Sequence, residues 1–373
     1  MSGAANADGA APAGEAPFSP LGTIDALQAL RAAAALLVVL DHALVAASNG
    51  GLIGAGIRPF AIYIGHLGVY VFFTVSGFVM VFSHGDDFDR PGAPLRFLAR
   101  RIGRIMPLHW LTTLAVAPLR PETVSGWTLI LSLLLIPHQM IGGSFGWPLY
   151  VPAWTLQYEL FFYLLFAVAL LLPRSRGLAL LAIALVAAVA AGTLGLLGRD
   201  NAAAYLAHPV LLYFLAGAAL GVAGPRVPEA WRPGFATALT IAAAAVAACA
   251  AAALAWGPVP LRVLLLTAAA PVAATAACAL SSAGGPPTRT RRAARAIGDS
   301  TYSIYMVHPF LVFPLGPFAA RHAPAMPWPL LVLLALGISV AAGLLTYRWV
   351  EKPLVRAFGR LLGQRPRIGG HPV

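Results

Sequence analysis

The chain has 373 residues, of which 59% are hydrophobic and only 10% are charged, and its formal net charge is +12. A chain of this length is too apolar for a soluble protein and too long for a single membrane anchor, so the composition predicts a polytopic membrane protein. We do not expect a nucleic-acid partner, because the basic residues lie in short loops between apolar runs, where they set membrane topology.

Apolar runs between charged residues or Pro/Gly breaks predict an all-α transmembrane helical bundle. About ten spans are expected, near residues 24–47, 61–83, 103–119, 153–172, 178–197, 204–223, 235–256, 260–281, 299–319 and 328–349. Residues 127–141 are also apolar, but the run is short and is flanked by Pro121 and contains Pro137, which is typical of a re-entrant or interfacial segment. The predicted organisation is a disordered cytoplasmic tail (1–22), one membrane domain (23–355) and a basic cytoplasmic tail (356–373).

Charge supports this topology. With the N-terminus inside, nineteen Lys and Arg residues fall in the cytoplasmic loops and tail and five in the outer loops, which is a strong positive-inside bias. Counting 127–141 as a crossing would reverse every later loop and remove the bias. Both termini are therefore expected in the cytoplasm.

The acidic, Ala/Gly/Pro-rich N-terminal tail has no basic region and is not expected to be a cleaved signal peptide. Cys249 and Cys278 fall inside predicted spans, so neither a disulfide nor a metal site is predicted.

The first span carries ionisable groups that are costly to place in hydrocarbon. Arg31 and His42 are eleven residues apart. On an α-helix this spacing returns the two side chains to one face within about 20° and separates them by about 16 Å along the axis. One long bound molecule could therefore contact both residues. The alternative is that Arg31 snorkels near one end while His42 sits at the other interface.

Basic residues also gather after the second span, where Arg100 and Arg104 are one helical turn apart and Arg96 and Arg101 are close by. This cluster could bind phosphate groups, or it could be topogenic charge that faces anionic lipid. Within the second span, Ser76 belongs to a surface of small residues suited to close helix packing.

Polar residues recur in the fourth and ninth spans and after the tenth. Glu159 lies about two turns below the outer end of the fourth span, and an intramembrane carboxylate should have a partner, for which Arg31 and His42 are candidates. Trp154 suits either an interfacial aromatic belt or a substrate platform. The ninth span contributes Tyr302, Tyr305 and His308. Ser303 and His308 are five residues apart, so they do not share a face and do not form a nucleophile pair.

Six motifs in this order resemble the acyltransferase-3 family of bacterial integral membrane proteins. They are Arg31 with ten residues before His42, FFTVSGF, RRIGRIMP, WTLQYELFFY with Glu159, GDSTYSIYMVH with His308, and YRWVEKP with Glu351. The stretches QALRAAAALLVVLDH and VSGFVM look most like the branch that modifies exopolysaccharide. Two departures are evident. Gln28 stands where the family usually has Asp, and no hydrolase-like domain follows the last span, which implies that the membrane domain works alone or with a separate partner.

The resemblance implies a multi-pass O-acyltransferase of the bacterial inner membrane. It would move an acyl group, commonly acetyl from acetyl-CoA, to a hydroxyl of a carbohydrate or lipid-linked glycan, with no bound cofactor. The CoA nucleotide would lie at Arg100, Arg101 and Arg104, the pantetheine arm would pass Arg31, and the thioester would reach His42, a candidate general base. Glu159 is expected to orient His42, because Asp41 points about 100° away. Residues expected to contact substrate or support the site are Ser76, Trp154, Tyr302, Tyr305, His308 and Glu351.

A transporter or flippase of a lipid-linked glycan is the alternative, with the intramembrane Arg, His and Glu lining a path. Such proteins usually show an internal repeat, whereas here the ionisable residues sit in the first four spans and the ninth. A catalytically inactive scaffold would require His42 to be dispensable. The sequence makes no prediction of oligomeric state.

Overall fold

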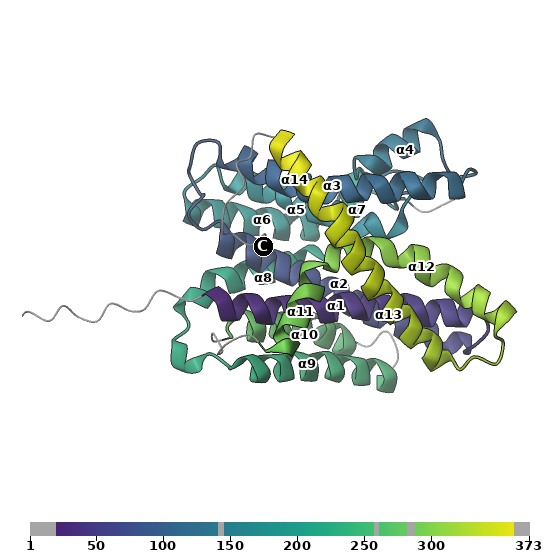
Figure 1. Ribbon diagram of the computed structural model, residues 1–373. Coiled ribbons are helices and arrows are strands. Elements are labelled where there is room, and N and C mark those ends of the chain that lie inside the picture. Colours follow the sequence, from purple (N-terminus) through teal and green to yellow (C-terminus); the bar gives the residue numbers. More distant parts are fainter. Residues whose placement is uncertain (1–19, 141–144, 257–260, 282–287, 362–373) are drawn as a thin grey trace, which may run out of the picture.

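The computed structural model describes residues 20–140, 145–256, 261–281 and 288–361. Within these ranges it contains helices and no β-strand, which confirms the all-α prediction (Figure 1). The long helices are α1 (Pro20–Asn49), α2 (Arg58–Ser83), α3 (Ala93–Val116), α5 (Trp154–Ala169), α6 (Arg174–Thr193), α8 (Leu211–Ala223), α9 (Phe235–Trp256), α10 (Leu261–Ala279), α12 (Thr301–His322) and α13 (Trp328–Thr346). The short helices are α4 (Gly126–Leu133), α7 (Ala202–Leu206), α11 (Arg289–Asp299) and α14 (Lys352–Leu361).

Six helical segments in the described ranges are long and apolar enough to cross a membrane: 25–49, 55–83, 151–169, 174–193, 301–322 and 328–361. They correspond to six of the ten predicted spans. Three further apolar helices are shorter, at 211–226, 235–249 and 269–279. The helix at the predicted span 103–119 is α3, whose first half carries the arginine cluster and is therefore less apolar. The finding supports a membrane protein with at least these six candidate spans.

Two predicted boundaries, those of the 204–223 run and of the third span, differ from the structure. The run 204–223 is not one helix but α7 and α8, separated by a short turn that contains Pro209. Helix α3 begins at Ala93, so the arginine cluster stands on a helix rather than in a loop. Residues 356–361, assigned to the basic tail, continue α14. Helix α4 has only 8 residues, too few for a crossing, as expected for the 127–141 segment.

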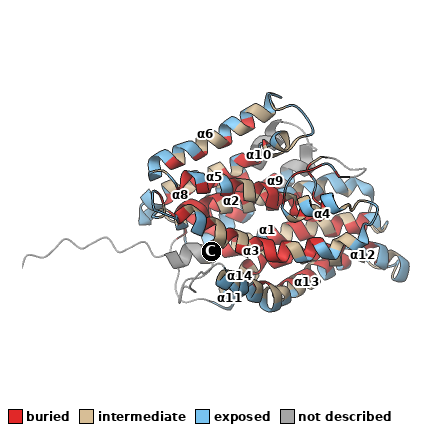
Figure 2. Cartoon of the chain, turned by 90° about the horizontal axis from the view of Figure 1, so that it is seen from above, coloured by how far each residue is buried: buried red, intermediate tan, exposed pale blue. Residues whose placement is uncertain are grey.

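The core is built around α2, which packs against both α1 and α8, and α6 lies at the periphery with most of its surface exposed (Figure 2). Glycine residues allow the backbones of α2 and α8 to approach each other closely. A Cβ on Gly217 of α8 would stand 1.9 Å from the Thr74 carbonyl oxygen, and one on Gly77 of α2 would stand 2.1 Å from that of Phe214. These reciprocal glycines bring the two backbones into direct contact, which is the packing mode of helices in lipid.

Candidate active site

Arg31 is held by a hydrogen-bond network at the junction of α11 and α12. Its guanidinium donates to Gln28 Oε1 at 3.0 Å and to Thr301 Oγ1 at 3.1 Å. Gln28 Nε2 in turn donates to Asp299 Oδ1 at 2.8 Å. The Asp299 carboxylate of α11 therefore supports Arg31 indirectly, through its hydrogen bond to Gln28. This network gives a physical role to the glutamine that departs from the family pattern.

Arg31 lines a cavity of about 130 Å³ between α1, α2, α3, α5 and α12. Seven of the sequence-predicted site residues meet there: Arg31, Ser76, Arg101, Arg104, Glu159, Tyr302 and Tyr305. Apolar side chains complete the walls, among them Phe72, Phe73 and Met80. The charged lining consists of three guanidinium groups and one carboxylate. The cavity is therefore suited to a partly apolar ligand that carries negative charge.

The three arginines expected to act together are divided. Arg101 is buried and packs its guanidinium over the rings of Phe97 and Tyr163, 5.8 and 5.7 Å from their centroids. Arg104 lines the cavity beside it. Arg100 does not line the cavity, and its guanidinium lies 3.6 Å from the Asp87 carboxylate. Only two members of the predicted trio can contact a molecule in the cavity.

His84 stands next to this cluster, immediately after the end of α2. Its ring is edge-on to Phe97, with the centroids 5.1 Å apart. Burial, with smaller contributions from Arg101 and Arg100, lowers the pKa of His84 to about 4. The imidazole is therefore neutral at pH 7 and adds no charge to the basic wall.

Glu159 accepts hydrogen bonds inside the cavity, from the Tyr163 hydroxyl and from Ser76 Oγ, the latter at 3.4 Å. Among the described residues no hydrogen bond or ion pair joins this carboxylate to His42, whose ring nitrogens lie beside His308 and Asp41. The expectation that Glu159 orients His42 is therefore wrong, whereas Arg31, the other candidate partner, lines the same cavity as Glu159. Helix packing places Ser76 of α2 and Tyr163 of α5 beside the Glu159 carboxylate in the cavity, which His42 does not line.

Glu351 is buried outside the cavity lining and accepts a 2.6 Å hydrogen bond from Ser303 Oγ. It ends a five-residue π-helix, Tyr347–Glu351, that connects α13 to α14. Such insertions re-aim side chains and are frequent near functional sites. Tyr302, one position before Ser303, lines the cavity and donates to the Ile105 carbonyl oxygen at 2.6 Å. The predicted residues of this region thus brace the cavity wall.

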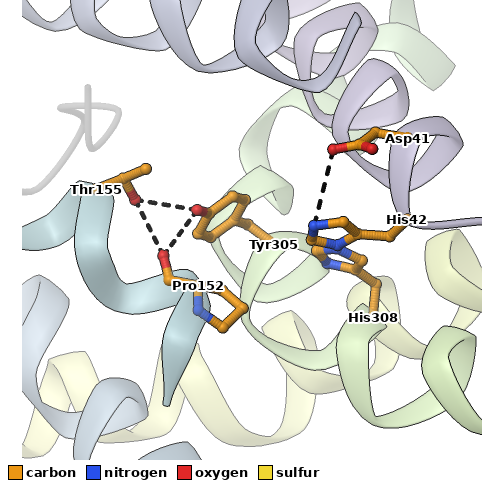
Figure 3. A network of polar contacts seen from close by, with 6 residues as sticks. All are labelled: Asp41, His42, Pro152, Thr155, Tyr305 and His308. Carbon is orange, nitrogen blue, oxygen red and sulfur yellow. Dashed lines mark hydrogen bonds and ion pairs between the residues drawn. The ribbon is translucent and has the colours of Figure 1, made fainter. Parts of the chain in front are cut away.

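His42 contacts His308, a partnership that sequence spacing did not identify. His42 Nδ1 and His308 Nε2 are 2.8 Å apart, and His42 Nε2 lies 3.9 Å from Asp41 Oδ2 (Figure 3). The prediction that Asp41 points away from the imidazole is wrong, because the side chain folds back beside its neighbour. The one available signal was the recurrence of a second intramembrane His on the ninth predicted span.

The hydrogen bonds define which nitrogens of this pair carry hydrogen when both rings are neutral. His308 Nδ1 is 3.0 Å from the Ile304 carbonyl oxygen, which can only accept, so this nitrogen donates. His308 Nε2 must then accept, and the shared hydrogen belongs to His42 Nδ1. His42 Nε2 remains unprotonated. It is the atom of the pair that can accept a proton from a substrate hydroxyl.

Tyr305 lines the cavity and stands between Thr155 and the histidine pair (Figure 3). Its hydroxyl donates to the Pro152 carbonyl oxygen at 2.8 Å and accepts from Thr155 Oγ1 at 3.1 Å. Its ring centroid is 5.9 Å from that of His308. His42 and His308 therefore lie beyond the cavity wall, while Arg31 lies within it. Of the two groups predicted on one face of α1, only Arg31 lines the cavity.

Trp154, predicted as belt or platform, does not line the cavity but belongs to a cluster of ring contacts at the start of α5. Sequence reasoning paired Trp154 with Tyr158 but missed His66 and Trp147, because these two come from other elements. Ring partners of Trp154 are His66 of α2, Trp147 of the preceding loop and Tyr158 of α5, with centroids 5.9 to 6.3 Å away.

Comparisons with known proteins identify the family of the chain. Residues 24–348 match the family model of an acyltransferase domain. The chain is also 30% identical over 301 residues to the exopolysaccharide production protein ExoZ of Rhizobium meliloti (strain 1021), an alignment that covers 79% of this chain and 90% of that protein. No solved structure gives a significant match. The chain therefore belongs to the acyltransferase 3 family and is a membrane acyltransferase.

Proposed function

We propose that the protein transfers an acetyl group from cytoplasmic acetyl-CoA to a hydroxyl of an exopolysaccharide or of its lipid-linked precursor. The acceptor class follows the similarity to a protein named for exopolysaccharide production. The observation that carries the donor assignment is the cavity in which Arg31, Arg101 and Arg104 face a single carboxylate. This excess of positive charge complements the phosphate groups of CoA.

The spacing on α1 supports the path of the donor. Arg31 lies in the cavity, and His42 is eleven residues further along the helix, about 16 Å away by its rise. A pantetheine arm is extended enough to connect these two positions. Tyr305 borders the cavity at its contact with His308. The thioester therefore passes the Tyr305 ring to reach His42.

His42 Nε2 then removes the proton from the acceptor hydroxyl as its oxygen attacks the thioester carbonyl carbon. A new C–O bond forms and the C–S bond breaks. The CoA thiolate leaves and takes the proton from His42, so the imidazole returns to its starting state. His308 acts as a positioning residue, since its hydrogen bond keeps the basic nitrogen of His42 on Nε2.

Location in the bacterial inner membrane with both termini in the cytoplasm completes the proposal. The charge distribution supports it, with nineteen basic residues in the loops and tail assigned to the inside and five in those assigned to the outside. The donor would then enter from the soluble CoA pool. The acceptor would approach His42 from the opposite side of the membrane.

Purified protein in lipid nanodiscs, incubated with acetyl-CoA labelled in the acetyl carbon and with deacetylated exopolysaccharide oligosaccharides, tests this proposal. We expect label in an alkali-labile ester on the oligosaccharide and one free CoA thiol for each ester formed. The His42→Ala protein is the matched control and should form no ester. Wild-type protein that releases no CoA and labels no oligosaccharide would refute the proposed donor and reaction.

A further inference from the structure

We propose that a cluster of aromatic and imidazole rings beside the cavity binds a pyranose ring of the acceptor; this inference rests on the proposed function. The acceptor platform, as we call it, consists of His66, Tyr70, Trp147, Trp154 and Tyr213. These residues come from α2, the 145–150 loop, α5 and α8. None of them lines the cavity that holds Arg31.

The rings of the platform contact one another in a continuous series. Tyr70 and Tyr213 are stacked, with centroids 4.4 Å apart and planes inclined by 10°. His66 stacks on Tyr70 at 5.9 Å and meets Trp154 edge-on at 6.3 Å. Trp147 lies 6.3 Å from Trp154. Belt residues at a membrane interface need only contact lipid, whereas these rings converge from four separate elements.

The exposure of His66 is separate evidence for a polar ligand at the platform. It lies within the candidate span 55–83, yet its side chain is exposed. An imidazole facing hydrocarbon would lose its hydrogen bonds to water, so polar side chains of membrane helices face cavities or bound polar groups. His208, also exposed, lies within electrostatic reach of His66. Two polar side chains therefore flank the aromatic faces.

This combination of groups is suited to a sugar. The C–H bonds on one face of a pyranose carry partial positive charge and pack against the negative face of an aromatic ring. Its hydroxyls require hydrogen-bond donors and acceptors, and a neutral imidazole provides one of each on its two ring nitrogens. An acyl chain would use the rings but leave the imidazoles unpaired, which is costly away from water. The chemistry therefore favours a carbohydrate over lipid.

The platform leads directly to the proposed site of transfer. Trp154 is adjacent in sequence to Thr155, which lines the cavity and hydrogen-bonds to Tyr305. On α2, Tyr70 is one helical turn from Phe73, another cavity-lining residue. A pyranose bound on the platform would thus place its neighbouring sugar near Tyr305, where the cavity approaches the histidine pair.

Separate kinetic constants for the two substrates test the platform. Trp147 is 41% exposed, so Trp147→Ala should disturb packing little; Trp231, 80% exposed and in none of the ring contacts of the described residues, gives the matched control Trp231→Ala. We expect Trp147→Ala and His66→Ala to raise the KM for oligosaccharide about tenfold. The KM for acetyl-CoA should stay at the wild-type value in both. An unchanged oligosaccharide KM, or equal changes in both constants, would refute the platform.

A direct binding measurement tests the platform independently of acetyl transfer. Quenching of tryptophan fluorescence by cellotetraose, and by galactotetraose as a second probe, is measured in nanodiscs without acetyl-CoA. We expect quenching in the wild type and in Trp231→Ala, and its loss in His66→Ala, which keeps every tryptophan. Wild-type protein that responds to neither sugar, or His66→Ala protein that responds like the wild type, would refute the platform even if acetyl transfer is observed.

Discussion

At the scale of single residues, the proposed base, His42, depends on a second imidazole that positions it. His308 is fully buried, and its Nδ1 is committed to the Ile304 carbonyl oxygen. It can therefore offer only Nε2 to His42, and it does so at 2.8 Å. The consequence is a single neutral arrangement in which His42 Nε2 is basic.

Substitutions at His308 should distinguish its hydrogen-bonding role from a role in filling space. His308→Gln retains an acceptor oxygen near the position of Nε2, whereas His308→Leu fills the space without one. We expect kcat to fall about a hundredfold in His308→Leu and less than tenfold in His308→Gln, with the KM for acetyl-CoA unchanged. His42→Ala should lose transfer while inserting normally. Equal losses in the two His308 variants would show that the residue acts through packing instead.

The division of the arginine cluster gives a second residue-scale prediction. Arg101 and Arg104 line the cavity, and Arg100 is paired with Asp87 outside it. We expect Arg101→Ala and Arg104→Ala each to raise the KM for acetyl-CoA at least about tenfold, the usual cost of one charge-assisted hydrogen bond. Arg100→Ala, the control from the same helix, should leave it within about twofold. A similar increase in all three variants would point to general surface charge as the cause.

At the scale of elements, close packing of α2 against α8 sets the shape of the cavity. Ser76, Val79 and Met80 of α2 line the cavity, and Gly77 between them contacts the α8 backbone. Because one face of α2 abuts α8 while the adjacent face forms the wall, displacement of this interface would move the lining residues. The glycine contacts therefore connect helix packing to the site.

A larger residue at this interface should disrupt the bundle. Gly217→Leu would place a Cβ 1.9 Å from the Thr74 carbonyl oxygen, so the helices must separate. We expect a much lower yield of monodisperse protein and a fall in the melting temperature of several degrees. Gly337→Leu on α13, where a Cβ meets nothing within 4 Å, is the matched control. Size-exclusion chromatography and a thermal melt in one detergent compare the two; equal behaviour would remove the packing role.

At the scale of the whole molecule, the reaction depends on which side each end of α1 faces. With the N-terminus in the cytoplasm, Arg31 would lie toward the inside and His42 toward the outside. Donor and acceptor would then approach from opposite sides, and the acyl group would cross most of the bilayer before transfer.

Cysteine labelling in cells determines this orientation. Asn49 at the end of α1 and Gly92 before α3 are both exposed. In a background with Cys249 and Cys278 replaced by Ala, Asn49→Cys should react with an impermeant maleimide added outside, and Gly92→Cys only after the membrane is permeabilised. The opposite pattern would place His42 on the cytoplasmic side. Transfer would then occur on the face that the CoA pool already reaches.

Much of the fold and the membership of the cavity could be predicted from local pattern. The lengths of the apolar runs predicted the helical class. Six of the ten predicted spans correspond to helices that are long and apolar enough to cross a membrane. The cost of placing charge in lipid singled out Arg31 and Glu159, because such residues persist only where a buried partner exists. Both side chains line the same cavity.

The contacts between distant segments were decided by tertiary structure alone. The approach of His308 to His42 joins residues 266 positions apart, and the support of Arg31 by Asp299 through Gln28 joins residues equally remote. Neither follows from helical periodicity, which relates side chains only along one helix. Whether Arg100 or Arg101 faces the cavity depended on how α3 is rotated about its own axis where it packs against α5. The sequence by itself determined which groups must be kept from lipid; the packing of helices determined which of them meet.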